Sequence, residues 1–598
     1  YLSPLKALNN DVQKNLLAPL ARLEARFVAA DIPARPVRVA VRSGDTQPNE
    51  RARIQRKPPE ILITTPESLN IMLTSQGGRS MLGGIRCVII DEVHAIAGNK
   101  RGTHLFSALE RLVLLSGEYQ RIALSATVRP LDRVAAAVAG FFPATDIPAL
   151  PGSLRPRPIR IIEASGQRRI ELTVASPLAA IPEGDRDVWW QSVATSCRDE
   201  ILKHHSTLCF CNSRRFTEKL ARYINEGRQE SLAWAHHGSL ARELRLVVEE
   251  RMKAGQLKAI VSTNTLELGI DIGQLDQVLL VQTPRQVSSA LQRIGRSGHG
   301  VGETSRAILF PLPGIDLAEA ACMAHAVHNR DIEEIRIPES PLDILSQILL
   351  SMVVSRDWTA DGLYTAILAC WPYRNLPRRH FDLVLDLLAG RYAITKVSEL
   401  SPRISIDPLD GRLKAKPGAA RLLYLSGGTI PDRGLFDLRV DGSNAKIGEL
   451  DEEFVWERSP GDTFALGSQV WRIQSISENA VSVRQVHEPP GIIPFWKQEN
   501  LPRDWHFSER LGIFMNLLET TPPNRMEEIL MQDYAMRPEA ARELVNLVAR
   551  QKERTGCALP HRNHILIEHS RESTGPAGST SVLLHTLWGS QINQPFAL

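Results

Sequence analysis

The first 150 residues show two spacings of apolar side chains, one typical of helices and one of buried strands. Apolar residues three or four positions apart at 11–28 and at 104–115 predict two amphipathic helices. Continuous apolar runs predict strands that are buried on both faces, at 60–66, 87–90 and 122–127. Residues 1–5 have the pattern of the end of another strand. Strands that alternate with helices in this way predict an α/β domain with a parallel sheet.

The same alternation resumes after a proline-rich stretch at 148–158, which predicts a linker. Four further strands are expected, at 207–211, 259–262, 278–282 and 307–312. A helix is expected at 214–224. This pattern predicts a second α/β domain that ends near residue 338.

The pattern then changes twice. Three short helical stripes between 341 and 392, the second preceded by the capping residue Thr359, favour a small winged-helix-like module. Residues 420–486 alternate with period two between glycine-containing breaks, which predicts an antiparallel β domain such as a barrel. Its expected strands include 454–456, 470–473 and 481–483.

Helices at 509–518 and 527–554 and a closing strand at 581–588 predict an incomplete C-terminal α/β part. The predicted domains therefore cover residues 1–150, 151–338, 339–395, 396–508 and 509–598.

The composition is that of an ordinary soluble globular protein, with 43% hydrophobic and 23% charged residues among 598. No apolar run approaches the roughly 18–20 residues of a membrane span, and no secretory signal opens the sequence. The seven cysteines lack the spacing of a zinc site, which favours reduced cysteines in a cytoplasmic protein without a membrane partner. The net charge of +4 is compatible with a polyanionic partner but does not require one.

The strand expected at 87–90 ends in two adjacent carboxylates, Asp91 and Glu92, with His94 close behind. Open α/β sheets bind their ligands at the carboxyl edge of the strands, so both acids are placed where a ligand would lie. From this stretch alone, an acidic strand end that only starts a loop is the alternative.

Three further polar stretches follow in a fixed order. Residues 125–127 (Ser-Ala-Thr) end a predicted strand, and residues 263–271 leave another strand through polar side chains into a Gly-Ile-Asp turn. Residues 292–299 place Arg293 and Arg296 among glycines. Arginines spaced around glycines, where backbone can approach a ligand, are typical of phosphate contacts.

Together these stretches resemble the motifs of superfamily 2 nucleic-acid helicases. Residues 91–94 resemble motif II, 125–127 motif III, 263–271 motif V, 292–299 motif VI, 1–8 motif Ia and 65–69 motif Ib. More narrowly, residues 91–104, 298–299, 447–454 and 584–589 resemble the Lhr (large helicase-related) family. The resemblance implies an α/β fold with two RecA-like parallel-sheet domains, followed by a winged-helix-like module and a β-rich C-terminal domain. It also implies an ATP-driven translocase that moves 3′ to 5′ on single-stranded DNA, with a role in DNA repair.

The resemblance further implies roles for single residues. Asp91 would hold Mg²⁺, and Glu92 would orient or deprotonate the water that attacks ATP. Arg296 would act as an arginine finger, with Gln292 beside it. Contacts to the nucleotide are implied for Gly269, Asp271, Arg293 and His299. Coupling of the nucleotide state to domain closure is implied for His94, Ser125, Ala126 and Thr127.

Contacts to nucleic acid are expected from residues whose hydroxyl, amide, ammonium or guanidinium groups suit backbone phosphates. These candidates are Ser3, Lys6, Thr65, Ser68, Arg214, Thr263 and Asn264, with Arg215 as a further one. Trp496 and Trp505 leave two readings open. In the first, one of them stacks on a base of the nucleic acid. In the second, which the pattern favours, they are buried in the β domain.

The sequence contains no Gly-x-x-x-x-Gly-Lys-Ser/Thr phosphate loop, and the lysine of residues 98–103 is misplaced for one. Because the resembling family carries this loop just upstream of motif Ia, truncation at both ends is expected. We predict that these 598 residues alone do not hydrolyse ATP at a motor-like rate.

The expected function is an ATP-dependent 3′–5′ DNA helicase that uses ATP and Mg²⁺. Its expected partner is single-stranded DNA, or a DNA/RNA duplex with a 3′ tail. Two alternatives stay open, a helicase that remodels RNA or RNA–DNA hybrids and a non-hydrolysing nucleic-acid-binding scaffold.

Overall fold

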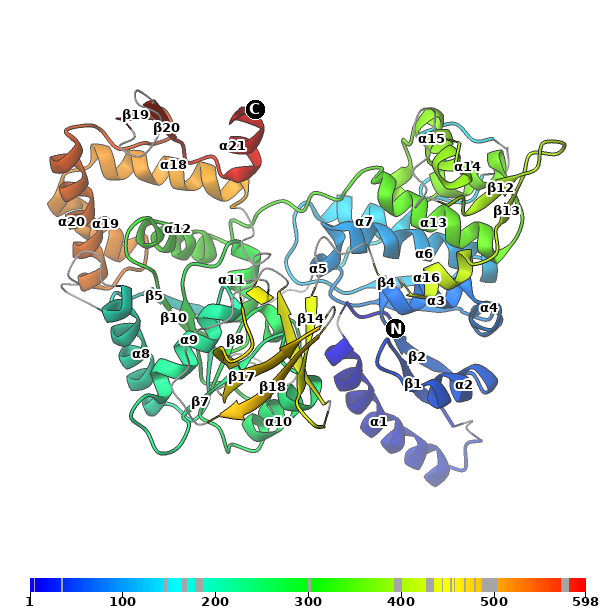
Figure 1. Cartoon of the computed structure of the whole chain (residues 1–598), viewed down its shortest axis with the longest axis horizontal. Coiled ribbons are helices and arrows are strands. Elements are labelled where there is room, and N and C mark those ends of the chain that lie inside the picture. The colour runs from blue at the N-terminus through cyan, green and yellow to red at the C-terminus, as the bar shows by residue number, and fades with distance from the viewer. Residues whose placement is uncertain are drawn as a thin grey trace. The chain divides into compact units, whose positions relative to one another are not determined.

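The structure is a computed structural model, and the part of the chain that it describes has several internal gaps. It describes residues 1–4, 6–33, 36–144, 148–163, 169–177, 186–269, 272–298, 303–391, 401–425, 428, 435–443, 445–451, 454–455, 458–466, 469–477, 480–486, 503–571 and 580–597. The chain divides into two units (Figure 1). Unit 1 comprises Tyr1–Ala164 and Glu334–Asp432, and unit 2 comprises Ser165–Glu333 and Arg433–Leu598.

The first sheet of unit 1 is parallel, as predicted. Its strands are β1 (Val39–Arg42), β2 (Ile61–Thr64), β3 (Cys87–Ile90) and β4 (Gln120–Ala123). β1 pairs with β2 and β3 with β4. Leu2 joins the two pairs, because it forms parallel bridges to both Ile90 and Thr64. The predicted strand end at the start of the chain is therefore confirmed, and it lies between β2 and β3.

Among the described residues, seven helices accompany this sheet, and the burial of β3 shows that its two faces are covered unequally. They are α1 (Lys6–Ala29), α2 (Pro48–Arg56), α3 (Pro66–Thr74), α4 (Gln76–Leu82), α5 (His94–Ala97), α6 (Lys100–Ser116) and α7 (Leu131–Ala139). Val88 and Ile90 are buried, whereas Cys87 is exposed and Ile89 half-buried. Successive side chains of a strand point to opposite faces. The expected burial of β3 on both faces is therefore wrong for one face.

β4 also differs from its prediction. It ends at Ala123, so the motif III residues 125–127 lie in the turn that follows rather than in the strand. Ile122 and Leu124 are exposed, although the apolar run predicted that they would be buried. An apolar run shows that residues favour burial, but only the neighbouring elements decide whether a face is covered.

The proline-rich stretch predicted as a linker has neither helix nor strand, yet it belongs to unit 1. Arg157 is buried there, with its Nη1 atom 2.9 Å from Glu110 Oε2 and its Nε atom 2.9 Å from Glu118 Oε2. The pair with Glu110 is buried and the Glu118 side chain is exposed, and together the two pairs hold the stretch against α6 and the loop that follows it. The first unit consequently continues to Ala164, past the predicted boundary at residue 150.

The winged-helix-like module is larger than predicted. It comprises α13 (Leu342–Ser355), β11 (Trp358–Thr359), α14 (Ala360–Leu368), α15 (Arg378–Ala389), β12 (Ile404–Ile406), β13 (Arg412–Ala415) and α16 (Ala419–Leu425). The predicted cap is confirmed, since the Thr359 side chain accepts the Gly362 N–H. β13 pairs antiparallel with both β11 and β12. Residues 404–415 therefore belong to this module, not to the β domain expected from residue 396, and α16 is helical where strand alternation was expected.

This module packs on the first α/β domain within unit 1, where α13 lies against α3 and α6 (Figure 1). Ser351 of α13 accepts a hydrogen bond from Arg111 Nη2 (2.6 Å) and lies 2.5 Å from the hydroxyl of Thr74. Lys100 and Asp343 form an ion pair at 2.6 Å. One apolar core runs through both modules, so they form one body.

The sheet of unit 2 confirms the second predicted α/β domain. Its strands are β5 (Ile170–Val174), β6 (Thr207–Cys211), β7 (Ala233–His236), β8 (Ala259–Ser262), β9 (Gln277–Val281) and β10 (Ser305–Phe310). They are all parallel, in the order β5-β10-β9-β6-β8-β7. The helices are α8 (Arg186–Lys203), α9 (Arg214–Asn225), α10 (Arg242–Lys253), α11 (Val287–Ile294) and α12 (Ile315–Asn329). Every residue of β6, β8 and β9 is buried, Cys209 and Cys211 included.

The β domain is a mixed sheet rather than the expected antiparallel one. Its strands are β14 (Leu435–Val440), β15 (Lys446–Asp451), β16 (Thr463–Leu466), β17 (Gln469–Ile476) and β18 (Ala480–Val486). β14 and β18 are parallel neighbours. Phe454 and Val455 are helical where a strand was predicted. The sheet attaches to the second α/β domain because Leu240 bridges Gly448, and a Cβ atom on Gly448 would lie 2.3 Å from the Ser239 carbonyl oxygen.

The C-terminal part of unit 2 contains α18 (Trp505–Thr520), α19 (Pro523–Gln532), α20 (Pro538–Thr555), β19 (Leu566–Arg571), β20 (Thr580–His585) and α21 (Ser590–Ala597). The single helix predicted at 527–554 is two helices, since the chain turns at Ala535 and pairs there with β5. Val174 donates its N–H to Ala535 O (2.9 Å) and accepts the Arg537 N–H (2.8 Å). Among the described residues, no helix has the length and apolar character required to cross a membrane.

Candidate nucleotide site and nucleic-acid contacts

Asp91 and Glu92 stand at the carboxyl edge of the first sheet. The Asp91 N–H donates to Leu2 O (2.8 Å), which continues the strand pairing up to the acids. Asp91 Oδ1 accepts the Glu92 N–H (2.9 Å), and Asp91 Oδ2 accepts the Tyr1 hydroxyl. Glu92 has a φ of +47°, an uncommon conformation for a residue with a side chain. Residues held in such sparsely populated conformations cluster at functional sites.

His94 connects these acids to the turn after β4. Its Nδ1 atom accepts the Ala126 N–H (3.1 Å) and lies 3.2 Å from Ser125 Oγ. Because Nδ1 accepts, the ring proton must be on Nε2, which lies 3.5 Å from Glu92 Oε2. Burial lowers the pKa of His94 to about 4, so the imidazole is neutral near pH 7. The His94 ring therefore lies between Glu92 and this turn, and its Nε2 atom forms no hydrogen bond among the described residues. Thr127, the last residue of motif III, is exposed.

The chemistry of the acids fits a magnesium ion held mainly by a nucleotide. Mg²⁺ in nucleotide sites keeps several waters and uses one or two carboxylates together with phosphate oxygens. Asp91 supplies one such carboxylate, and both of its oxygens already accept hydrogen bonds, which suits a contact through water. Among the described residues, no cluster of three or more His, Cys, Asp or Glu side chains is placed to hold a metal. The remaining ligands would come from the nucleotide.

Arg293 of the motif VI stretch, predicted to contact the nucleotide, has protein partners in this structure. It is buried and lies over the Phe210 ring. Its Nε atom is 2.9 Å from Glu267 Oε2, and its Nη1 atom donates to Asn212 Oδ1 (3.1 Å). Two nitrogen atoms of the guanidinium therefore already have protein partners. Arg293 links motif VI to motif V through Glu267, and to the end of β6 through Asn212. Neither Glu267 nor Asn212 was assigned a role from the sequence.

The other residues of motifs V and VI lie around this pair. Gln292, Arg296 and Gly269 are half-buried, with Arg296 in the turn that follows α11. Asp271 and His299 lie outside the described residues. Gly298 lies close to the backbone of Thr304, because a Cβ atom on Gly298 would meet Thr304 O at 2.5 Å.

A buried histidine that the sequence did not single out holds the motif V turn. His236, at the end of β7, has its Nδ1 atom 2.9 Å from the Thr265 hydroxyl and its Nε2 atom 3.0 Å from Glu249 Oε1. Burial lowers the pKa of His236 despite this carboxylate. Thr263, before the turn, is buried, and Asn264 is exposed.

The hydroxyl groups expected to bind phosphate in unit 1 serve the fold in this structure. Thr65 caps α3 by accepting the Ser68 N–H (3.3 Å), and its hydroxyl donates to Ser68 Oγ (3.2 Å). Both side chains are buried, as is Ser3. The side chain of Lys6 lies outside the described residues.

The candidates in unit 2 differ in exposure. Arg214 donates to Ser239 Oγ (2.5 Å), and Arg215 is exposed. Trp505 begins α18 and is 41% exposed, so its expected burial in a β domain is wrong. Trp496 lies outside the described residues.

Arg101 joins the two nucleic-acid motifs of unit 1 and was not assigned a role from the sequence. Its Nε atom is 2.7 Å from Glu67 Oε1, and its Nη2 atom donates to Pro4 O (2.7 Å). This pair holds the pKa of Glu67 below its ordinary value, although burial acts in the opposite direction. Arg101 therefore links motif Ia at Pro4 to motif Ib at Glu67.

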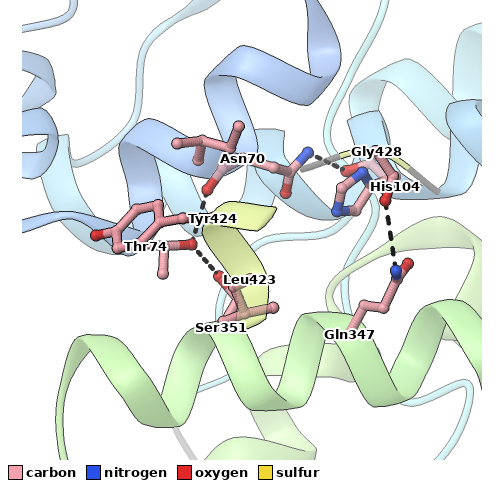
Figure 2. A pocket seen from close by; sticks show the side chains of 9 residues that line it. Asn70, Thr74, His104, Gln347, Ser351, Leu423, Tyr424 and Gly428 are labelled. Atoms are coloured by element: carbon pink, nitrogen blue, oxygen red, sulfur yellow. Dashed lines mark hydrogen bonds between the residues drawn. The ribbon is translucent and has the colours of Figure 1, made fainter. Parts of the chain in front are cut away.

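A pocket in unit 1 lies beside these motifs (Figure 2). It is lined by Asn70, Ile71, Thr74, His104, Gln347, Ser351, Leu423, Tyr424 and Gly428. Figure 2 shows the Thr74 hydroxyl bonded to both Asn70 O and Ser351, at the contact between α3 and α13. No residue of motif II, V or VI lines it, so the pocket is not the nucleotide site.

Three family models match the chain. They are the DEAD/DEAH box helicase model at residues 1–134, the helicase conserved C-terminal domain at 193–300, and the winged helix domain of the large helicase-related protein at 325–493. With the two parallel sheets and the acids at the strand edge, they define a DEAD/DEAH-box helicase.

Similar proteins narrow this class. An ATP-dependent helicase Lhr-Core protein 2 of Thermococcus barophilus is 35% identical over 99% of the chain and 67% of its own length. An Lhr helicase and probable uracil glycosylase of Mycolicibacterium smegmatis is 37% identical over the whole chain and 41% of its own length. The structure of Mycobacterium smegmatis helicase Lhr bound to ssDNA and AMP-PNP matches with a TM-score of 0.79, 36% identity and coverage of 100% of this chain and 71% of that one. The chain belongs to the Lhr family.

The lengths of these relatives set a limit. The chain spans 41% of the length of the Lhr relatives from M. smegmatis and Escherichia coli. The activity, substrates and partners of these longer relatives are therefore carried over to this chain only as proposals.

Proposed function

We propose that this chain is the motor part of an ATP-dependent helicase that moves 3′ to 5′ along single-stranded DNA in DNA repair. The observation that carries the proposal is the contact of His94 with both Glu92 and the Ser125–Ala126 turn, because it links the acids to a second motif. Such a link is what a motor needs to convert the state of a nucleotide into movement. The M. smegmatis relative bound to ssDNA and AMP-PNP supports both ligands.

The proposed chemistry assigns a role to each acid. Bound Mg²⁺ would neutralise charge on the phosphates of ATP. Asp91 would help to hold such an ion, and Glu92 would orient the attacking water and accept its proton. Neutral His94 lies beside Glu92, with its Nε2 atom 3.5 Å from Glu92 Oε2, and limits the positions that the carboxylate can take. Arg296 meets the charge that develops on the phosphate, a contribution of about 10³–10⁵ in rate in related systems.

Substitution of Glu92 tests this proposal in a chain extended upstream so that it carries a phosphate loop. Glu92→Gln should lower DNA-stimulated ATP turnover about 10²–10⁴-fold, because the amide cannot accept the proton. Binding of AMP-PNP should be unchanged. Asp132→Asn, at an exposed acid of α7, serves as the control and should turn over ATP normally. Normal turnover by the Glu92→Gln variant would refute the role of Glu92.

The polarity and the nucleic acid are tested by strand displacement. Duplexes with a 3′ or a 5′ tail, each with a DNA or an RNA tracking strand, should show unwinding only from a 3′ DNA tail. Unwinding along RNA would replace the proposal with the RNA-remodelling function. DNA binding without turnover in the extended chain would instead favour a scaffold.

We also propose that the 598 residues by themselves do not turn over ATP. The sequence holds no phosphate loop to carry the β and γ phosphates and a hydroxyl ligand for the metal. Turnover by this chain alone that Glu92→Gln abolishes would contradict this proposal.

A further inference from the structure

The helix that leads into motif VI begins without a cap from its own segment of the chain. α11 starts at Val287, and the side chain of Gln286 at its N-cap forms no capping hydrogen bond. The first N–H groups of a helix have no partner within the helix, so they need an acceptor from elsewhere. Because Val287 is buried, that acceptor has to come from another part of the protein.

Glu333 supplies this acceptor from beyond α12, the helix that packs beside α11 (Figure 1). Glu333 Oε2 accepts the Val287 N–H (2.9 Å), and Oε1 accepts both the Ser288 N–H (3.2 Å) and the Ser288 hydroxyl. The side chain is buried and forms no ion pair among the described residues. Carboxylates are rarely buried without a cation, and this one relies on three donors and on the positive end of a helix. Each of these bonds goes to the start of the motif VI helix.

The two ends of α11 therefore have different partners. Arg293, near the C-terminal end, is held by Glu267 and Asn212. Val287 lies six residues before Arg293, which is about 9 Å along the helix axis, and Arg296 lies about 4.5 Å beyond Arg293. With Arg293 as the pivot, a shift of about 2 Å at Val287 would turn the axis by about 12° and displace Arg296 by about 1 Å.

Glu333 is also the last residue of unit 2 before the chain continues in unit 1. Two residues further on, within unit 1, the Ile335 N–H donates to Arg129 O (2.6 Å), just after motif III. Gly98, which follows the motif II helix α5, also lies close to Ile335, because a Cβ atom on Gly98 would be 3.2 Å from Ile335 Cγ2. Only Glu334, which is exposed, separates the residue anchored in unit 2 from the residue anchored in unit 1.

We propose that Glu333 is a positioning residue of the motor, which sets the direction of the motif VI helix and thereby the place of Arg296. This inference rests on the proposed function, because Arg296 acts there as the arginine finger. Misplacement by about 1 Å can cost about 10²-fold in rate, so the hold on the start of α11 affects the reaction. The segment from Glu333 to Ile335 also gives the region after motif III a short covalent path to α11.

Glu333→Gln tests this role in the chain that is extended upstream to carry a phosphate loop. The amide keeps one oxygen acceptor but loses the second oxygen and the negative charge, so the start of α11 is released. We expect kcat for DNA-stimulated ATP turnover to fall about 10–10²-fold, with the Kd for AMP-PNP and for oligothymidylate unchanged. Glu334→Gln, at the exposed neighbouring residue, is the matched control and should turn over ATP normally.

A second substitution separates positioning from simple capping of the helix. Gln286→Asp, added to Glu333→Gln, gives α11 a cap from its own segment, and the extended backbone of Gln286 (φ −136°, ψ 143°) suits an aspartate at this position. Deuterium uptake of residues 284–294 should rise in Glu333→Gln and return to the unaltered level in the double variant. Turnover should stay low in the double variant, because the local cap does not fix the helix to residue 333.

Two results would overturn the proposal. One is recovery of both turnover and helix protection in the double variant, since Glu333 would then only cap α11. The other is equal turnover by Glu333→Gln and Glu334→Gln. Both leave the proposed function standing, whereas absence of DNA-stimulated turnover by the unaltered extended chain would refute that function and this inference with it. If circular dichroism shows that Glu333→Gln does not fold, Glu333→Asp, whose carboxylate is one carbon shorter, replaces it with the same expected outcomes.

Discussion

Removal of the Glu267 carboxylate gives the sharpest test of how motifs V and VI are held together. Glu267 Oε2 lies 2.9 Å from Arg293 Nε, and the two side chains are only 13% and 8% exposed. Glu267→Gln leaves the Arg293 charge buried with Asn212 as a neutral partner. Loss of one partner of a buried ion pair costs about 3–5 kcal/mol of stability.

Two further variants make the magnitude interpretable. Glu50→Gln breaks the Glu50–Arg53 pair, whose side chains are 47% and 78% exposed, and it should cost less than about 1 kcal/mol. Glu267→Leu combined with Arg293→Met removes both charges, and it should recover most of the stability, because apolar replacements of a buried pair are often neutral. In the chain extended upstream to carry a phosphate loop, recovery of stability without recovery of ATP turnover would assign Arg293 a further role in the reaction.

The assay is denaturant unfolding followed by tryptophan fluorescence, to which Trp189 and Trp190, buried in unit 2, contribute. We expect the unfolding midpoint of unit 2 to fall clearly with Glu267→Gln and to stay in place with Glu50→Gln. Equal effects of the two single variants would refute the reasoning. Arg293 would then be free to bind phosphate, as the sequence predicts.

Two other predictions concern stability. Burial lowers the pKa of both His94 and His104 to about 4, so both imidazoles are neutral when folded and gain a proton on unfolding below pH 6.5. The unfolding free energy of unit 1 should therefore be highest above pH 6.5 and fall as the pH is lowered to 4, by up to about 3 kcal/mol for each histidine. His104→Gln should flatten this dependence, and equal stability at about pH 7 and pH 5 would contradict it. Gly448→Ala should destabilise unit 2 by about 1–3 kcal/mol, because its Cβ atom would lie 2.3 Å from Ser239 O, whereas Gly84→Ala, with nothing within 4 Å, should be neutral in thermal unfolding.

Three neighbouring strands of the second sheet, β6, β8 and β9, were predictable because every residue in them is buried. β5 and β7 of the same sheet were not predicted, and each has residues that are only partly buried or exposed. The apolar run at 207–211 predicts β6 with the bounds that the structure has, and every residue of it is buried. The first sheet was harder, since Ile122 belongs to an equally apolar run and is 37% exposed. A hydrophobic pattern shows that side chains favour burial, but it does not show whether another element packs on that face of the sheet.

Candidate site residues show the same division. Asp91 and Glu92 could be found because two acids after a buried strand must stand at the sheet edge. The partner of Arg293 could not be found in this way. Glu267 precedes it by 26 positions, and nothing in that spacing distinguishes an ion pair from two separate surface charges.

The sequence by itself determined the order of the motifs, the two parallel sheets and the absence of a phosphate loop, since each is a local pattern of residue types. Tertiary structure alone decided where the modules belong. The winged helix shares a core with the first α/β domain because Ser351 and Asp343 meet side chains some 240 positions earlier in the chain. The β domain joins the second α/β domain because Gly448 admits the Ser239 carbonyl. Such contacts depend on shape and distance between segments far apart in the chain, and no local pattern of polar and apolar residues contains them.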